Sequence, residues 1–503
     1  MTAKFKKRID KRKKKIAERL KNDGAIGCKP VMDANRIRYE LSKKVDATTC
    51  GGIGVIHKMN QMLKLPELIN SNLQLLSVHK PYFESDHVLN MVYNIVAGGK
   101  YIEDLELRRN DTAYMTALGS TRIPDPTTAG DFLRRFETPE QMEKLFEINN
   151  EYNRRVWKVS SNGQKRKQAI LNIDGKIVET LGEYKEKMDM SYKGKWGFST
   201  LIITEMTTGV HIFCINRSGN TLSQSEAAYW INRAIEVLKE YFDEILIEGD
   251  TAYYLTEMLD ELDTDGVKFI FAVDQFDNLK KSAENIDDNE WIKVERIELG
   301  TKKREHKKQN VKELKIIERN YRHVVQREEY ASEFSYTPTK CRNQYRIIVV
   351  RQLKELITSG LFQYFYYQYR FAITNLKESE SSTIECLDLI RKRANHENKI
   401  EQLESGVFAL NMPTKEFYAN QAYMMICAMA WNMKSYIGML CPDKSLGEKI
   451  ISMEFRKFKL YFINIQTQII KQGRYIVYRL LGFNQYIENL ILTFERICKL
   501  EYG

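Results

Sequence analysis

The chain has 503 residues, of which 43% are hydrophobic and 11% aromatic, and its formal net charge is +11. This length predicts roughly two to four domains, and this apolar content excludes a chain that is disordered throughout. The longest apolar stretches, such as residues 422–431, are well short of the ~20 residues of a membrane-spanning helix. The basic N-terminus also lacks the apolar core of a secretory signal. We therefore expect a cytoplasmic protein with no membrane partner.

The cysteines are scattered along the chain. They form no Cys-x-x-Cys pair, and no histidine stands at the spacing of a zinc ligand. This pattern argues against both a structural zinc site and a disulfide framework. We expect most of the cysteines to be reduced thiols in the core.

Positive charge is concentrated in two blocks. Residues 1–20 are dense in lysine and arginine, with only Asp10 and Glu18 as acids. Either block alone is typical of a solvated surface or a disordered arm. Together they favour a polyanionic partner, because neutralised phosphates release condensed counterions. The second block, which we expect to contact nucleic acid, comprises Lys302, Lys303, Arg304, Lys307 and Lys308.

The N-terminal third reads as a basic arm and linker over residues 1–45, followed by a helical domain over residues 46–165. In that domain Asp125 and Pro126 have the types preferred at a helix N-cap and first turn. The helix they begin is either the second helix of a helix-turn-helix, with Arg134 and Arg135 on DNA, or an ordinary helix of an all-α domain.

After residue 166 the apolar pattern changes to that of an α/β domain. The predicted order is three strands, a helix, a strand, a helix and a strand: residues 167–173, 198–204, 210–215, 223–241, 244–250, 253–262 and 267–273. This order predicts a ribonuclease H-like core, a mixed sheet with flanking helices, formed by residues 166–276 and 366–414. We expect a β-rich insertion subdomain over residues 277–365 and a helical C-terminal region over residues 415–503.

Two aspartates end apolar, β-branched runs of that core. Asp174 precedes a glycine and Asp250 follows one. If neighbouring strands end together, the two carboxylates meet at one sheet edge, where they repel unless cations lie between them. Such hard oxygen ligands suit Mg²⁺ or Mn²⁺. The alternative is that each aspartate merely marks a strand end, and Glu248 is a rival to Asp250.

A long helix is predicted after Ser382, which has capping-box spacing to Glu385. Three glutamates and an arginine lie on one face of this helix, because they are spaced three or four residues apart. Either a metal or basic partner faces these side chains, or they are simply exposed. The residues on this face are Ile390, Arg393, Glu397, Glu401 and Glu404.

Residues 390–404 resemble the Y-(2)-R-(3)-E-(6)-K signature of bacterial insertion-sequence transposases. Arg393 and Glu397 match the arginine and the glutamate, whereas Ile390 replaces the tyrosine and Glu404 replaces the lysine. The sequence around Asp174 resembles the first acid motif of these enzymes, and residues 248–253 resemble the second. Residues 97–105 and 125–128 also resemble the transposase DDE domain group 1 family. The likeness covers most of residues 50–440.

The resemblance implies a DNA transposase in which Asp174, Asp250 and Glu397 hold two Mg²⁺ or Mn²⁺ ions. It also implies strand cleavage and joining, double-stranded DNA at the element's ends and in the target, a homodimer on DNA, and a place at the bacterial nucleoid. Arg393 and Lys399 would contact DNA. The alternatives are a ribonuclease H-like nuclease or resolvase that cuts without joining, and a DNA-binding derivative that has lost catalysis.

Overall fold

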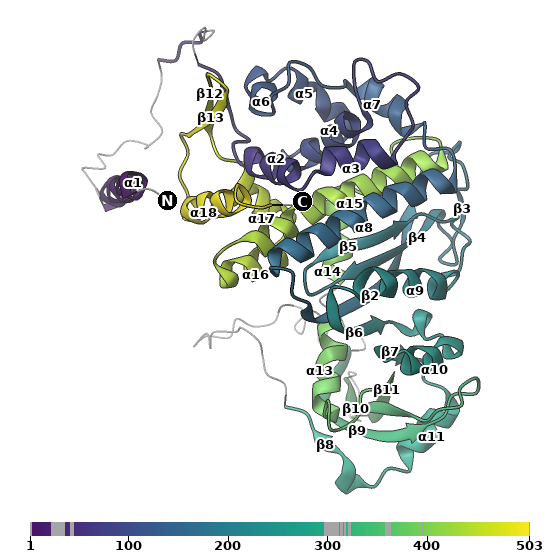
Figure 1. Ribbon diagram of the computed structural model, residues 1–503. Helices are drawn as coiled ribbons and strands as arrows, with labels where there is room; N and C mark the ends of the chain where they lie inside the picture. Colours follow the sequence, from purple (N-terminus) through teal and green to yellow (C-terminus); the bar gives the residue numbers. More distant parts are fainter. Residues whose placement is uncertain are drawn as a thin grey trace.

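A computed structural model of the protein describes residues 3–21, 36–40, 45–295, 323–357, 364–393 and 397–501, and the single positions 311, 315, 318 and 319. Its core is a ten-stranded mixed sheet in the order β3-β4-β2-β6-β7-β11-β10-β9-β8, with β5 paired to β4 (Figure 1). Strands β2, β6 and β7 are parallel to one another, and the other pairs are antiparallel. The strands of the first half are β2 (Arg166–Glu179), β3 (Asp189–Met190), β4 (Trp196–Glu205), β5 (Val210–Ile215), β6 (Phe242–Gly249) and β7 (Lys268–Val273).

The second half of the sheet is formed by the β-rich stretch predicted for residues 277–365 and by the strand that returns the chain to the core. It consists of β8 (Ile292–Lys293), β9 (His323–Tyr336), β10 (Tyr345–Ile357) and β11 (Tyr364–Thr374), preceded by α11 (Asp277–Glu284) and η3 (Asp288–Glu290). Phe371 of β11 pairs with Val273 of β7, so these strands continue the core sheet. The reason is that the last four residues of β11 are buried and pack on the core, whereas most of its earlier residues are exposed.

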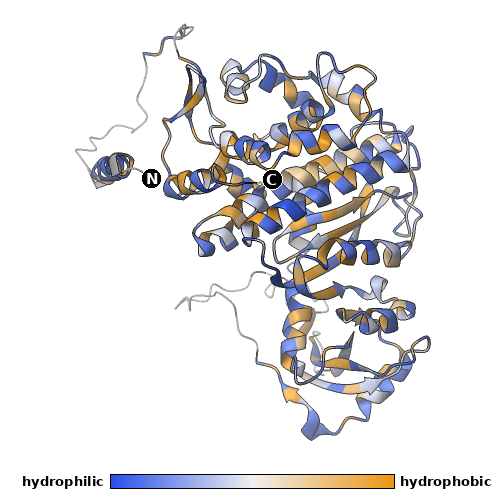
Figure 2. Ribbon diagram, in the orientation of Figure 1, coloured by the Kyte–Doolittle hydropathy of each residue, from blue (hydrophilic) through white to orange (hydrophobic). Residues whose placement is uncertain are grey.

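The two faces of the sheet are covered by different helices, as β6 shows. Leu246 packs in a cluster with residues of α13 (Thr383–Arg393), whereas Ile245 and Ile247 belong to the main core. That core includes the apolar face of α9 (Ala227–Leu238). Strand side chains alternate between faces, so even-numbered positions of β6 face α13. Figure 2 shows hydrophobic residues concentrated on the strands between these layers.

Helices from both ends of the chain form a second layer around α15 (Phe417–Leu440), which packs on β5, α4 and α8. The N-terminal members, which confirm a helical region, are α2 (Ile53–Met62), α3 (Leu65–Asn72), α4 (Glu84–Val96), η1 (Ile102–Asp104), α5 (Leu105–Arg109), α6 (Thr112–Ala117), α7 (Pro126–Leu133) and α8 (Pro139–Ser160). The C-terminal members are α16 (Lys444–Ser452), α17 (Phe455–Phe458), η6 (Lys459–Ile463) and α18 (Ile487–Ile497). No helix among the described residues could span a membrane.

The C-terminal region is mostly helical, and it also contains a hairpin that was not predicted. Strands β12 (Thr467–Gln472) and β13 (Tyr475–Leu480) form a hairpin that pairs with β1 (Ala47–Thr48), far away in sequence. Gly473, at φ +59°, supplies the turn that a β-branched residue would resist. The basic segment at the N-terminus forms α1 (Ala3–Lys21), and Arg12 donates to the carbonyl oxygen of Leu480 at 3.5 Å.

Candidate active site at one edge of the sheet

Asp174 and Asp250 lie on neighbouring parallel strands, which confirms the prediction about their placement. Ile173 of β2 is paired with Gly249 of β6, so the next residue on each strand is one of the aspartates. Parallel neighbours are ~4.8 Å apart, which brings the two carboxylates to one edge. Ile170, four residues before Asp174, packs with the α13 cluster. Both aspartates therefore face the α13 side of the sheet.

Local hydrogen bonds fix the backbone around each aspartate. Asp174 Oδ1 accepts from the backbone N–H of Gly175 at 2.7 Å, and Asp250 Oδ1 accepts from that of Ala252 at 3.0 Å. The second bond caps the short helix η2 (Thr251–Tyr253). Gly175 is needed here because a Cβ at that position would lie 2.8 Å from both the Thr200 carbonyl oxygen and the Tyr253 hydroxyl.

A tyrosine and an arginine support the aspartates from the sheet interior. Tyr253 is 1% exposed, and its hydroxyl has no hydrogen-bond partner among the described residues. Burial raises the pKa of Tyr253, Asp174 and Asp250 raise it further, and Arg217 lowers it. Buried Arg217 donates to backbone oxygens of Ser199 at 3.2 Å and Ser225 at 2.8 Å. Sequence reasoning missed both residues; an arginine just after the apolar run 210–215 was the available signal.

Glu248 is a third carboxylate at this edge. It lies two residues before Asp250 on the same face and is paired in register with Asn172. The side chain is 2% exposed. Burial raises the pKa of Glu248 to about 7, against the lowering effect of Arg393 and Lys392. The structure thus keeps Glu248 as a rival to Asp250 for the acid role.

Helix α13 crosses the edge beside these acids, as predicted. Ser382 and Glu385 form the expected capping box, with the Ser382 N–H 2.8 Å from Glu385 Oε2. At the other end of the helix Arg393 lines a small cavity of about 10 Å³ together with Glu248 and Gly249. The arginine of the signature therefore lies at the acidic edge.

The structure describes the predicted helix after Ser382 in separate segments. Helix α13 is described as far as Arg393, and α14 (Glu397–Glu401) and the π-helical turn η5 (Gln402–Gly406) follow after three residues that lie outside the described part of the chain. Glu397 begins α14, but its side chain is also outside the described residues. Its orientation toward the aspartates therefore stays a prediction.

Two charged residues of α14 and η5 contact the core sheet. The Glu404 carboxylate forms an ion pair with Lys176, which lies two residues after Asp174 on β2. The Lys399 ammonium donates to the Met206 carbonyl oxygen at 3.3 Å. Burial lowers the pKa of Lys399 to about 8, with Glu205 opposing that effect. Lys399 faces protein, which argues against the predicted contact with DNA.

The remaining residues predicted to bind DNA lie away from the acidic edge or outside the described chain. Asp125 caps α7 as expected, by accepting from the Thr128 N–H at 2.8 Å. Arg134 forms an ion pair with Asp131 at 2.7 Å, and Arg135 donates to the Leu75 carbonyl oxygen at 3.5 Å. Their role on DNA stays a prediction. The block of Lys302, Lys303, Arg304, Lys307 and Lys308 lies outside the described residues.

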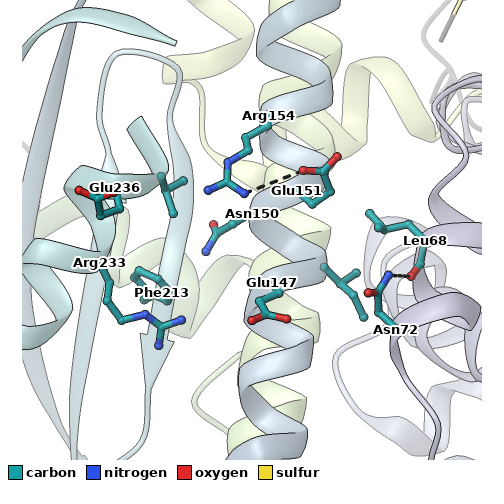
Figure 3. Close-up of a pocket in the computed structure, with 11 residues that line it drawn as sticks. Leu68, Asn72, Glu147, Asn150, Glu151, Arg154, Phe213, Arg233 and Glu236 are labelled. Atoms are coloured by element: carbon teal, nitrogen blue, oxygen red, sulfur yellow. Dashed lines mark hydrogen bonds and ion pairs between the residues drawn. The ribbon is translucent and has the colours of Figure 1, made fainter. Parts of the chain in front are cut away.

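A larger cavity, of about 520 Å³, lies between α3, α8, α9 and β5 (Figure 3). Carboxylates and guanidinium groups line it together, including Glu147, Arg154 and Arg233. Arg233 is neutralised by Glu143 at 2.6 Å. The acids of the sheet edge are not among the lining residues, so this cavity is separate from the candidate active site.

The acidic edge fits a divalent cation. Asp174 and Asp250, with Glu248 as the rival to Asp250, supply carboxylate oxygens, the ligands that Mg²⁺ and Mn²⁺ prefer. The buried Asn172 Nδ2 has no hydrogen-bond partner among the described residues, which leaves an N–H donor for a bound water beside the carboxylates. No described group of three or more His, Cys, Asp or Glu residues is close enough to hold a metal alone. A third carboxylate ligand from Glu397 would complete the set.

The fold and this edge define an α/β protein with one aspartate within β2 and a second directly after the adjacent parallel strand β6. The sequence matches the transposase DDE domain group 1 family over residues 35–502, and the chain belongs to that family. Divalent metal ions are general in DDE transposases. No curated protein matches the chain. Among solved structures, a piggyBac transposase synaptic complex with hairpin DNA is 10% identical, with TM-score 0.39, over 83% of this chain and 82% of that one.

Proposed function

We propose that this transposase binds the ends of its insertion sequence, cleaves them and transfers the 3′-OH ends into target DNA. The observation that supports this reaction best is the register of β2 and β6, which brings Asp174 and Asp250 together on the face that α13 crosses. We further propose that the sheet and its flanking helices are a ribonuclease H-like core.

In this proposal Asp174, Asp250 and Glu397 hold two Mg²⁺ or Mn²⁺ ions. When bound, such ions activate an attacking water or 3′-hydroxyl and stabilise the leaving oxygen. Tyr253 and Arg217 keep the strand ends in place behind the carboxylates. Arg393, at the mouth of the site, orients Glu397 or contacts a phosphate.

The DNA on both sides of the site would be held mostly through its backbone. Helix α1 carries a dense row of lysines and arginines and suits this role. The helical domain of residues 46–165 and the basic block of residues 302–308 are the other proposed contacts. Because two element ends must be joined in one complex, we propose that a homodimer acts on DNA.

The test is cleavage of a plasmid that carries the coding sequence with its flanking ends. Asp174→Asn, Asp250→Asn and Glu397→Gln should each reduce Mg²⁺-dependent cleavage by more than about a hundredfold while DNA binding persists. Asp277→Asn, an exposed aspartate of α11, is the control and should cut normally. If one of the three variants cuts at the wild-type rate, its assignment is wrong, and Glu248 or Glu401 becomes the candidate.

The same reaction separates a transposase from a nuclease or an inactive derivative. Joining of the released 3′ ends to a second plasmid is the expected result. Cleavage without joining would identify a nuclease or resolvase. Binding without cleavage would identify a DNA-binding derivative.

A further inference from the structure

Lys176 lies beside the acidic edge on the same strand as Asp174. Residues two apart on a strand point to the same face, so its side chain emerges on the α13 side, ~6.6 Å beyond the aspartate. The Thr200 hydroxyl accepts from the Lys176 N–H at 3.3 Å and donates to its carbonyl oxygen at 3.0 Å. These bonds fix the backbone from which the ammonium group projects.

The partner of Lys176 is the carboxylate of Glu404, in η5. The side chains are 33% and 51% exposed, respectively. An ion pair this exposed contributes little to folding stability, because water solvates both charges when the pair is broken. The fold therefore does not depend on this contact, and the ammonium group can exchange the carboxylate for another anion.

Cations lie on both sides of the paired aspartates. Lys176 is on β2 beyond Asp174, and Arg393 lies over the end of β6 beside Glu248. A phosphodiester strand whose reacting phosphate lies at the aspartates would carry its next phosphate toward one of these cations. A lysine suits such a contact, because its ammonium group is a compact point charge on a flexible stem.

We propose that Lys176 binds the DNA phosphate next to the one that is cleaved, and that Glu404 holds the ammonium group until DNA arrives. This inference rests on the proposed function. It predicts that removing Lys176 and removing Glu404 have opposite effects on DNA binding. Loss of the lysine removes a phosphate contact, whereas loss of the glutamate removes a competitor of the phosphate.

The test compares Lys176→Gln with Glu404→Gln by fluorescence anisotropy. The probe is a short duplex with the end of the element that encodes the chain, and Ca²⁺ replaces Mg²⁺. Lys176→Gln should weaken binding by about tenfold, the loss of one charged hydrogen bond, and make the slope of log K against log salt shallower by about 1. Glu404→Gln should leave affinity unchanged or raise it by up to about fivefold.

A matched pair controls for the loss of any exposed ion pair. Lys293 and Glu328 contact each other at 2.8 Å on β8 and β9, with side chains 62% and 37% exposed. Lys293→Gln and Glu328→Gln should leave both affinity and salt dependence unchanged. Thermal unfolding should show equal, small effects for Lys176→Gln and Glu404→Gln.

A methylphosphonate locates the contact on the DNA. Replacing the phosphate beside the cleavage position by this neutral group should weaken binding by the wild-type chain and not weaken binding by Lys176→Gln any further. Additive losses, or equal losses of affinity in Lys176→Gln and Glu404→Gln, would overturn the inference. Failure of the proposed function can be distinguished from failure of this inference, because the wild-type chain would then not cut the same duplex in Mg²⁺.

Discussion

Acidification should destabilise this protein through a buried histidine. His211, on β5, is 0% exposed, and its Nδ1 lies 2.8 Å from the Thr204 hydroxyl. Its Nε2 has no hydrogen-bond partner among the described residues. Burial lowers the pKa of His211 from 6.5 to about 3, and the positive charges of Lys399 and Lys434 contribute to that shift. The folded protein therefore strongly favours the neutral ring.

The direction in which pH changes the unfolding free energy follows from the linkage between protonation and folding. The unfolded chain takes up the proton below about pH 6.5, whereas the folded chain resists it until about pH 3. The stabilising contribution is complete above pH 6.5 and is lost as the pH falls toward 3. Each pH unit in that window costs about 1.4 kcal/mol. From pH 7 to pH 5 the wild-type chain should lose about 2 kcal/mol of unfolding free energy through His211 alone.

The assay is urea unfolding at those two pH values, followed by tryptophan fluorescence. Trp431 is a suitable reporter, because its ring lies 5.8 Å from the His211 ring. His211→Gln removes the titrating group, so its loss of unfolding free energy on acidification should be smaller than that of wild type by about 2 kcal/mol. His79→Gln, at an exposed position, should behave as wild type. Equal losses in His211→Gln and wild type would refute the reasoning.

Three further predictions concern backbone strain, an unpaired hydroxyl and DNA binding. Gly209→Ala should destabilise the fold by roughly 1–3 kcal/mol in thermal unfolding, because φ is +72° and the new Cβ would lie 2.9 Å from the Ile451 side chain; unchanged stability would show that the turn relaxes. Tyr253→Phe should leave stability unchanged or raise it by about 1 kcal/mol, and a clear loss would reveal a partner for the hydroxyl. Deletion of residues 1–22 should weaken DNA binding and flatten its salt dependence, whereas an unchanged slope would reduce α1 to a passive tail.

The parts of the fold that the sequence predicts correctly are marked by patterns among residues close together in the chain. Asp125 and Ser382 are recognisable as caps from neighbours within three residues. Asp174 and Asp250 are recognisable because each ends an apolar, β-branched run beside a glycine, and the predicted ribonuclease H-like order makes their two strands neighbours. The placement of the two acids could therefore be predicted without coordinates.

The parts that could not be predicted depend on distant partners. Strand β12 pairs with residues 47–48 near the other end of the chain. The contact of Lys176 with Glu404 joins residues 228 positions apart. Composition and periodicity carry no information on which of several exposed charges will meet across such a distance.

The metal dependence of Asp250→Cys tests the central claim most directly. A thiolate is a poor ligand for Mg²⁺ and a better one for softer ions such as Mn²⁺. If Asp250 holds the catalytic ion, the ratio of the cleavage rate in Mn²⁺ to that in Mg²⁺ should rise at least about tenfold above the wild-type ratio. If Asp250→Cys instead cleaves in Mg²⁺ at the wild-type rate and keeps the wild-type ratio of the two rates, this result would contradict a metal site built on Asp174 and Asp250.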